Sequence, residues 1–114
     1  MWVFTKRGFV SIIASESSPN FLMIQSRFPG HIEALFPKAQ VTEAPYGIYR
    51  YRAAVQKHVV AETLLDLVEH IDYSTFKKSI PDERYREAVI DAWNTLNKYD
   101  LGPGKPHEPE EFMP

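Results

Sequence analysis

Alternating apolar and polar residues mark the first quarter of the chain and predict β-strands there. Residues 2–5 and 9–14 are β-rich runs separated by Lys6-Arg7-Gly8, and a short polar connector ending in glycine is typical of a β-hairpin. A turn-rich Ser/Pro/Asn segment follows, and residues 21–27 alternate well enough to predict a third strand. The chain therefore begins with three strands joined by short turns.

The next thirty or so residues predict one short helix and two more strands. Pro29 suits a first helical turn, and a helix to about Phe36 would end at Pro37, which cannot continue it. Residues 40–43 predict a short strand. Residues 48–55 predict a longer one, because they are β-compatible throughout. The sheet then has four or five strands.

The second half of the chain has the apolar periodicity of helices. The clearest signal lies in residues 58–71, where apolar side chains recur at helical spacing, at Val60, Leu64, Leu67, Val68 and Ile71. A short helix is expected at 75–79, and Pro81-Asp82 begins another that runs to about Tyr99. The apolar stripe of this last helix is formed by Tyr85, Val89, Trp93 and Leu96.

This order of elements predicts an α+β fold. We expect an antiparallel sheet of four or five strands with helices packed on one face, close to a ferredoxin-like plan, and the other face open. Residues 1–101 are expected to form a single domain. Residues 102–114 are rich in Pro, Gly and acidic residues and have no period, so they predict a flexible tail.

The open face is expected to combine arginines with other polar or aromatic side chains. In residues 48–55, strict alternation would turn Arg50 and Arg52 toward the open face. If Leu22 and Ile24 belong to the core, the open face gains Met23, Gln25 and Arg27. Strand 2–5 leaves two alternatives, in which the open face receives either Trp2 and Phe4 or Val3 and Thr5.

Composition narrows the possible functions. The formal net charge is −2, which gives no overall field to attract nucleic acid or anionic membranes, so any such role needs a local patch. The chain has no cysteine, which excludes thiolate nucleophiles and sulfur-ligated metals. Its start lacks the pattern of a signal peptide and its apolar stretches are short, so we expect a cytoplasmic protein without a membrane partner.

No catalytic residue, metal site or cofactor is predicted. The sequence has no phosphate-binding loop, dinucleotide glycine pattern or nucleophile elbow, and its four histidines do not pair at metal-ligand spacing. His70, Asp72, Tyr73 and Lys77 form the densest polar cluster, which would suit proton transfer. Helix capping and anchoring of the connection explain the cluster better, so an enzyme is the least favoured interpretation.

The favoured hypothesis is a binding module. Arginine forks bind phosphate oxygens and aromatic rings on a sheet stack bases, so the open face would hold an anionic ligand such as a nucleotide or single-stranded nucleic acid. The alternative is a protein-interaction module or homodimer that uses the same face. A structural role for the arginines, covering the sheet and pairing with glutamates, is also open. The candidate ligand-binding residues are Thr5, Ser11, Arg27, Arg50, Arg52, Tyr73 and Lys77.

Three stretches carry a resemblance to a known group of proteins. The opening MWVFTKRGF at 1–9, YRYR at 49–52 and IDYSTFK at 71–77 resemble a family of small uncharacterised bacterial and phage-associated proteins. The resemblance covers about residues 1–99. It implies a bacterial protein and the boundaries of the fold, but no activity and no functional residues.

Overall fold

A computed structural model describes residues 1–99 of the chain. The chain divides into two compact units, Met1–Asp72 and a second unit that begins at Tyr73, and each is described by itself. The single domain expected over residues 1–101 stays a prediction, and the tail expected at 102–114 lies outside the described residues.

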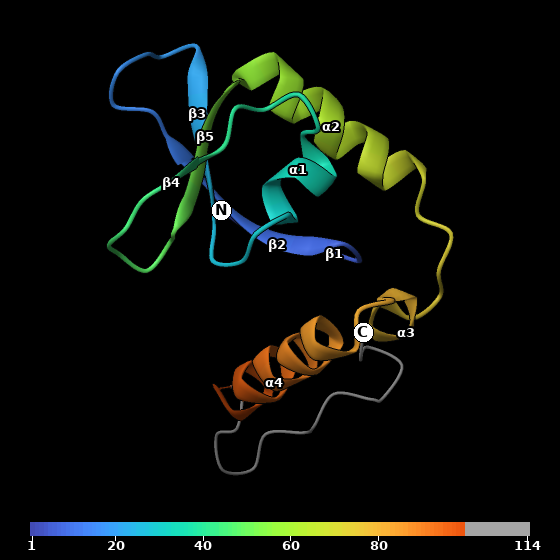
Figure 1. The fold of residues 1–114 in the computed structure, drawn as a ribbon. Coiled ribbons are helices and arrows are strands. Elements are labelled where there is room, and N and C mark those ends of the chain that lie inside the picture. The colour runs from blue at the N-terminus through green and yellow to red at the C-terminus, as the bar shows by residue number, and fades with distance from the viewer. Residues whose placement is uncertain (100–114) are drawn as a thin grey trace. The chain divides into compact units, whose positions relative to one another are not determined.

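An antiparallel sheet of five strands forms the first unit (Figure 1). The strands are β1 (Trp2–Thr5), β2 (Gly8–Ala14), β3 (Phe21–Ser26), β4 (Thr42–Glu43) and β5 (Tyr51–Gln56). Their order is β1-β2-β3-β5-β4, and every neighbouring pair is antiparallel. The predicted α+β class is confirmed, and the ferredoxin-like plan is compatible with it.

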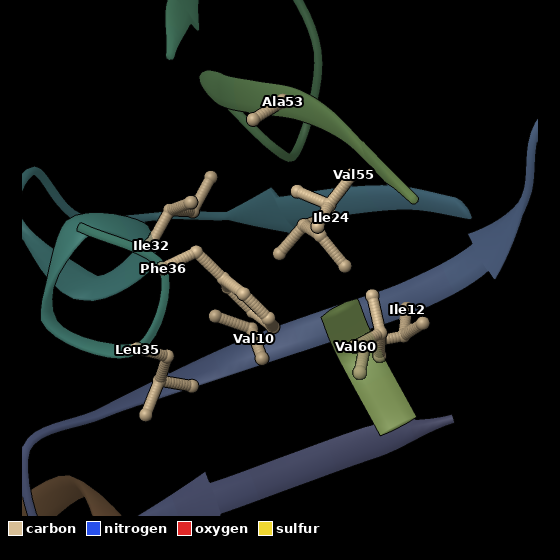
Figure 2. Close-up of a cluster of buried hydrophobic side chains, with 9 residues drawn as sticks. All are labelled: Val10, Ile12, Ile24, Ile32, Leu35, Phe36, Ala53, Val55 and Val60. Carbon is tan, nitrogen blue, oxygen red and sulfur yellow. The ribbon is translucent and has the colours of Figure 1, made fainter. Parts of the chain in front are cut away.

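The core lies between one face of this sheet and two helices, α1 (His31–Leu35) and α2 (Lys57–Glu69). Figure 2 shows the buried side chains that meet there, which are Val10, Ile12, Ile24, Ile32, Leu35, Phe36, Ala53, Val55 and Val60. Alternate strand residues point to one face of a sheet, which is why every second residue of β2, β3 and β5 contributes. Both helices of the first unit therefore cover the same face, as predicted.

The apolar stripe predicted for α2 is longer than the set of α2 side chains that packs against the core. Val60 is buried, and Leu64 and Leu67 pack against the core, but Val68 and Ile71 are 65% and 53% exposed. The helix ends at Glu69, where the backbone N–H of His70 bonds the Asp66 carbonyl. Val68 lies about 100° around the helix from Leu67 and so misses the sheet, while Ile71 lies beyond the helix.

Three strands are shorter than predicted. Strand β4 has residues 42–43 instead of 40–43. Strand β3 ends at Ser26 instead of Arg27, because the chain turns there and the Ser26 hydroxyl donates to the Phe28 carbonyl at 3.0 Å. Strand β5 begins at Tyr51 instead of residue 48. The preceding residues belong to the β4–β5 connection, which is closed by a bond from the Ala44 N–H to the Arg50 carbonyl. Arg27 and Arg50 therefore lie outside the strands in which they were predicted.

The second unit contains α3 (Phe76–Ser79) and α4 (Glu83–Tyr99). An Asp82 carboxylate oxygen accepts the Tyr85 N–H at 3.0 Å and satisfies a free donor of the first turn of α4. In the predicted stripe of α4, Tyr85 and Val89 are buried and Trp93 is half-buried. Leu96 is 64% exposed, which corrects its assignment to the buried stripe.

The start of α1 depends on a glycine in the left-handed region. Gly30 has φ 86°, and a Cβ placed there would meet no atom within 4 Å, so only the backbone conformation penalises a larger residue. We expect Gly30→Ala to lower the free energy of unfolding by about 1–2 kcal/mol. Gly30→Asn should cost less, because asparagine tolerates this conformation. Urea denaturation measures both, and an alanine variant as stable as the parent would contradict this account.

Candidate functional site

The face of the sheet opposite the core carries one row of side chains that crosses all five strands. The strand register pairs Trp2 with Ser11, Ser11 with Gln25, Gln25 with Arg52, and Arg52 with Thr42. Each of these residues alternates with a core-facing neighbour, so the row lies on the open face. We call the four polar residues of this row, which are Ser11, Gln25, Arg52 and Thr42, the polar row. Met23 and Gln25 thus lie on the open face, as predicted.

An aromatic cluster stands at the β1–β2 end of the open face. Phe4 stacks on Phe9 with ring centroids 4.4 Å apart, and Trp2 meets the same Phe9 ring edge-on at 5.6 Å. Trp2 is 67% exposed and Phe4 37%. Of the two alternatives for β1, the structure has Trp2 and Phe4 on the open face, because Val3 is opposite Val10 on the core face.

A second, apolar row lies on the other side of the polar row. Ile13 pairs with Met23 and Met23 with Ala54 in the strand register. Ile13 is 45% exposed although it is a large hydrophobic residue. The open face thus combines aromatic, polar and apolar side chains in adjacent rows, and such a surface suits a partner that has both flat apolar groups and hydrogen-bonding groups.

The three predicted arginines have different environments. Arg52 projects from β5 onto the open face, is exposed, and forms no ion pair among residues 1–99. Arg50 precedes β5 and forms an exposed ion pair with Glu43 at 2.8 Å. Arg27 follows β3 and is exposed. Pairing with a glutamate, which the sequence left open as a role for the arginines, therefore applies to Arg50 and, within residues 1–99, not to Arg52.

Thr5 and Ser11 are largely inaccessible. The Thr5 hydroxyl donates to the Gly8 carbonyl at 3.0 Å and accepts the N–H groups of Arg7 and Gly8 at 3.2 Å each. These bonds hold the β1–β2 turn together, so the Thr5 hydroxyl has a structural role. Ser11 lies in the polar row but is only 3% exposed, and its contribution to a surface contact is small.

The polar cluster predicted around residues 70–77 is divided between the two units. His70 and Asp72 belong to the first unit, where His70 contacts Asp66 at 3.2 Å and Asp72 contacts Lys6 at 3.9 Å. Tyr73 and Lys77 belong to the second unit. The Tyr73 ring packs on Phe76 with centroids 5.7 Å apart, and Lys77 is half-buried in α3.

His31 in α1 supports the strand that carries Phe9, a role that the sequence did not predict. Its Nδ1 accepts the backbone N–H of Phe9 at 3.1 Å. Because β3 ends at Ser26, this N–H has no strand partner on its β3 side, and the histidine supplies the acceptor instead. No periodicity or spacing signals such a bond, since it links residues 22 positions apart.

A hollow of about 370 Å³ lies where β5 continues into α2. Its lining residues are Asn20, Gln56, Lys57 and His58. The Lys57 N–H donates to the Asn20 carbonyl at 2.9 Å and joins the start of α2 to the β2–β3 connection. Gln56 also belongs to the open face, because it alternates along β5 with the same spacing as Arg52 and Ala54.

No group of three or more His, Asp or Glu side chains among residues 1–99 has the arrangement of a metal site. None of the helices in this part of the chain combines the length and apolar character needed to cross a bilayer. Comparison of the chain with protein-family models, curated proteins and solved structures gives no match.

Proposed function

We propose that the chain is a binding module whose open sheet face holds a nucleotide or single-stranded nucleic acid. The observation that carries the proposal is that one face of the sheet bears the aromatic cluster on β1 and β2, with Trp2 and Phe4 exposed, and, two strands away from β2, Arg52 on β5, which forms no ion pair within residues 1–99. Sheet surfaces that bind single strands combine these two features, rings for the bases and cations for the phosphates.

The aromatic cluster provides the stacking surface. The Phe9 ring on β2 contacts both Phe4 and Trp2 on β1, and Trp2 remains 67% exposed. Stacking of a base on such a ring contributes about 1–3 kcal/mol and tolerates any base. A ligand bound here would therefore be recognised mainly by its flat rings, with little dependence on sequence.

The polar row provides the groups for phosphates and base edges. Arg52 offers a planar fork of donors that matches a phosphate, and Gln25 beside it has an amide that can both donate and accept. With a net charge of −2, the whole chain does not attract polyanions. In this proposal, the charge of Arg52 supplies the electrostatic attraction for the phosphates. A substitution of Arg52 is therefore the most direct test of phosphate binding.

We expect Arg52→Gln to weaken binding of a fluorescein-labelled 12-nucleotide thymidine strand by about tenfold, or about 1.4 kcal/mol. Fluorescence anisotropy at low salt measures the affinity, which in the parent should fall as salt is added, because counterions are released from the phosphates. Arg50→Gln is the matched control. Its side chain already pairs with Glu43, so its removal should change affinity much less.

Circular dichroism checks that both variants remain folded, which is expected because each replaces an exposed residue. A parallel titration with ATP separates a nucleotide site from a strand-binding site. If neither probe binds at low salt, or if the two arginine variants lose affinity equally, the proposal is wrong.

A protein partner is the second candidate, and the apolar row favours it. Ile13 and Met23 offer surface that a phosphate ligand would leave uncovered, and Arg50 is neutralised by Glu43. In this case, Arg52→Gln should leave oligonucleotide titrations unchanged, because no binding is present to lose. Ile13→Ser should then reduce capture of the partner, with only a small change in the unfolding midpoint.

A further inference from the structure

The two outer strands of the sheet, β1 and β4, differ in how their free edges are protected (Figure 1). Strand β4 has only two residues, and one of them, Glu43, is charged and paired with Arg50. Pro45 follows directly after Ala44 and cannot donate to a strand partner. Short length, charge and proline are the usual protections against pairing with another chain.

Strand β1 has none of these protections. It has four residues, WVFT, without charge or proline, and its register with β2 runs from Trp2 to Thr5 without a bulge. Lys6 and Arg7 lie in the turn, beyond the strand. The two side chains nearest the free edge on the open face are Trp2 and Phe4, at 67% and 37% exposed. Apolar exposure and an unprotected edge therefore coincide.

The backbone of β1 presents hydrogen-bonding groups at this edge. Met1 and Ile12 exchange both of their bonds, with the Met1 amino group donating at 2.9 Å and the Ile12 N–H at 2.8 Å. Antiparallel strands alternate, so Val3 and Thr5 also bond toward β2. The N–H and C=O groups of Trp2 and Phe4 are consequently directed away from β2, toward a side on which the described residues 1–99 place no strand.

We infer that this edge pairs with the same edge of a second copy of the chain. In an antiparallel arrangement centred on Val3, Trp2 of each copy exchanges both backbone bonds with Phe4 of the other. The arrangement is self-complementary, since the same two residues provide every donor and acceptor. It also brings Trp2 beside Phe4 of the second copy on the open face, and cross-strand aromatic pairs stabilise a sheet.

The area involved indicates a weak dimer. A fully covered aromatic side chain buries about 150–250 Å², so Trp2 and Phe4 at 67% and 37% exposed supply on the order of 200 Å² per copy. Stable interfaces bury about 800 Å² per partner. The inference rests on the strand edge and does not require that the open face bind nucleic acid.

Sedimentation equilibrium of the full 13.2 kDa chain from micromolar to millimolar concentration tests this dimer. The parent should shift from monomer to dimer as concentration rises. Two double variants, Trp2→Lys/Phe4→Lys and Trp2→Glu/Phe4→Glu, should each remain monomeric, because like charges would then face each other across the contact. Mixed together, they should form a heterodimer, since lysine of one copy then faces glutamate of the other.

Ile13→Lys is the matched control, because Ile13 lies on the same open face but in the interior strand β2. It should self-associate like the parent, and so should Arg52→Gln, which isolates the dimer from nucleic-acid binding. Circular dichroism confirms that each variant is folded. A parent that stays monomeric at millimolar concentration would falsify the inference, as would an Ile13→Lys variant that loses association equally or folded charge variants that do not associate when mixed.

Discussion

Ile24→Ala is expected to lower the free energy of unfolding by about 2–5 kcal/mol. Ile24 is completely buried in β3, with β2 on one side of it and β5 on the other, directly between Ile12 and Ala53. Alanine would remove three carbon atoms from a position that neighbouring strands hold in place, so the cavity cannot collapse easily. Urea denaturation followed by circular dichroism measures the change.

Ile13→Ala is the control for this prediction. It makes the same chemical change in the adjacent strand, but Ile13 lies on the open face and is 45% exposed. Its cost should be about 1 kcal/mol or less, mainly from the lower strand preference of alanine. If Ile24→Ala and Ile13→Ala lowered the free energy of unfolding equally, Ile13 would be as buried in solution as Ile24, and the assignment of the two faces would be wrong.

Gly8→Ala should destabilise the chain by about 1–3 kcal/mol through crowding. A Cβ on Gly8 would lie 2.6 Å from Cγ and 2.9 Å from Cβ of His31, closer than real atoms approach. The ring cannot move away freely, because its Nδ1 accepts the Phe9 N–H. The clash therefore either strains the strand or breaks this bond. Chemical denaturation gives the cost, and the hydrogen-exchange rate of the Phe9 amide reports whether the bond survives.

A double-mutant cycle with His31→Ala identifies the source of this cost. His31→Ala alone should destabilise the chain, because the Phe9 N–H loses its acceptor. In that background, Gly8→Ala should cost less, since the ring atoms Cγ and Cδ2 have been removed and only the contact with the Cβ of residue 31 remains. If Gly8→Ala costs the same with and without the histidine ring, the strain does not come from the ring.

Strands β1 to β3 were predictable because their signals are local. The three-residue connector Lys6-Arg7-Gly8 and a Ser/Pro/Asn segment before Phe21 separate runs of β-favouring residues. Each pair of neighbouring strands in the sequence is also a pair in the sheet. The face of β1 was not predictable, because both of its alternating sets contain apolar residues. Only the register opposite β2, with Val3 beside Val10, decides it.

The predicted start of β5 and the predicted stripe of α2 were wrong because residue types alone do not show where a turn begins or where a helix stops facing the sheet. Ile48 and Tyr49 favour strands, yet they are used by the β4–β5 connection, whose Gly47 has φ 107°. As a result, Arg50 lies in the connection and pairs with Glu43, whereas Arg52 lies in β5 opposite Gln25. In α2, the helical spacing continues to Val68 after the side facing the sheet has been filled by Leu64 and Leu67. Neither effect can be seen in a pattern of residue types.

The candidate site was partly predictable for the same reasons. Arg52 follows from alternation within β5, and the aromatic cluster contains residues that the sequence placed in strands. The stacking of Phe4 on Phe9, the support by His31 and the pairing of Arg50 with Glu43 depend on three-dimensional neighbours. Only the structure brings these residues together.

The strand order also sets the entropy of assembling the sheet. The β2–β3 connection spans residues 15–20, whereas the chain between β3 and β5 spans residues 27–50, four times as many. Two doublings of loop length add about 1.2 kcal/mol to the cost of bringing the ends together. Helix α1 lies within this longer segment and packs against β2 and β3. Once α1 is docked, the free chain that remains before β5 is shorter, so part of the entropic cost of the longest connection is already met by the packing of Ile32, Leu35 and Phe36.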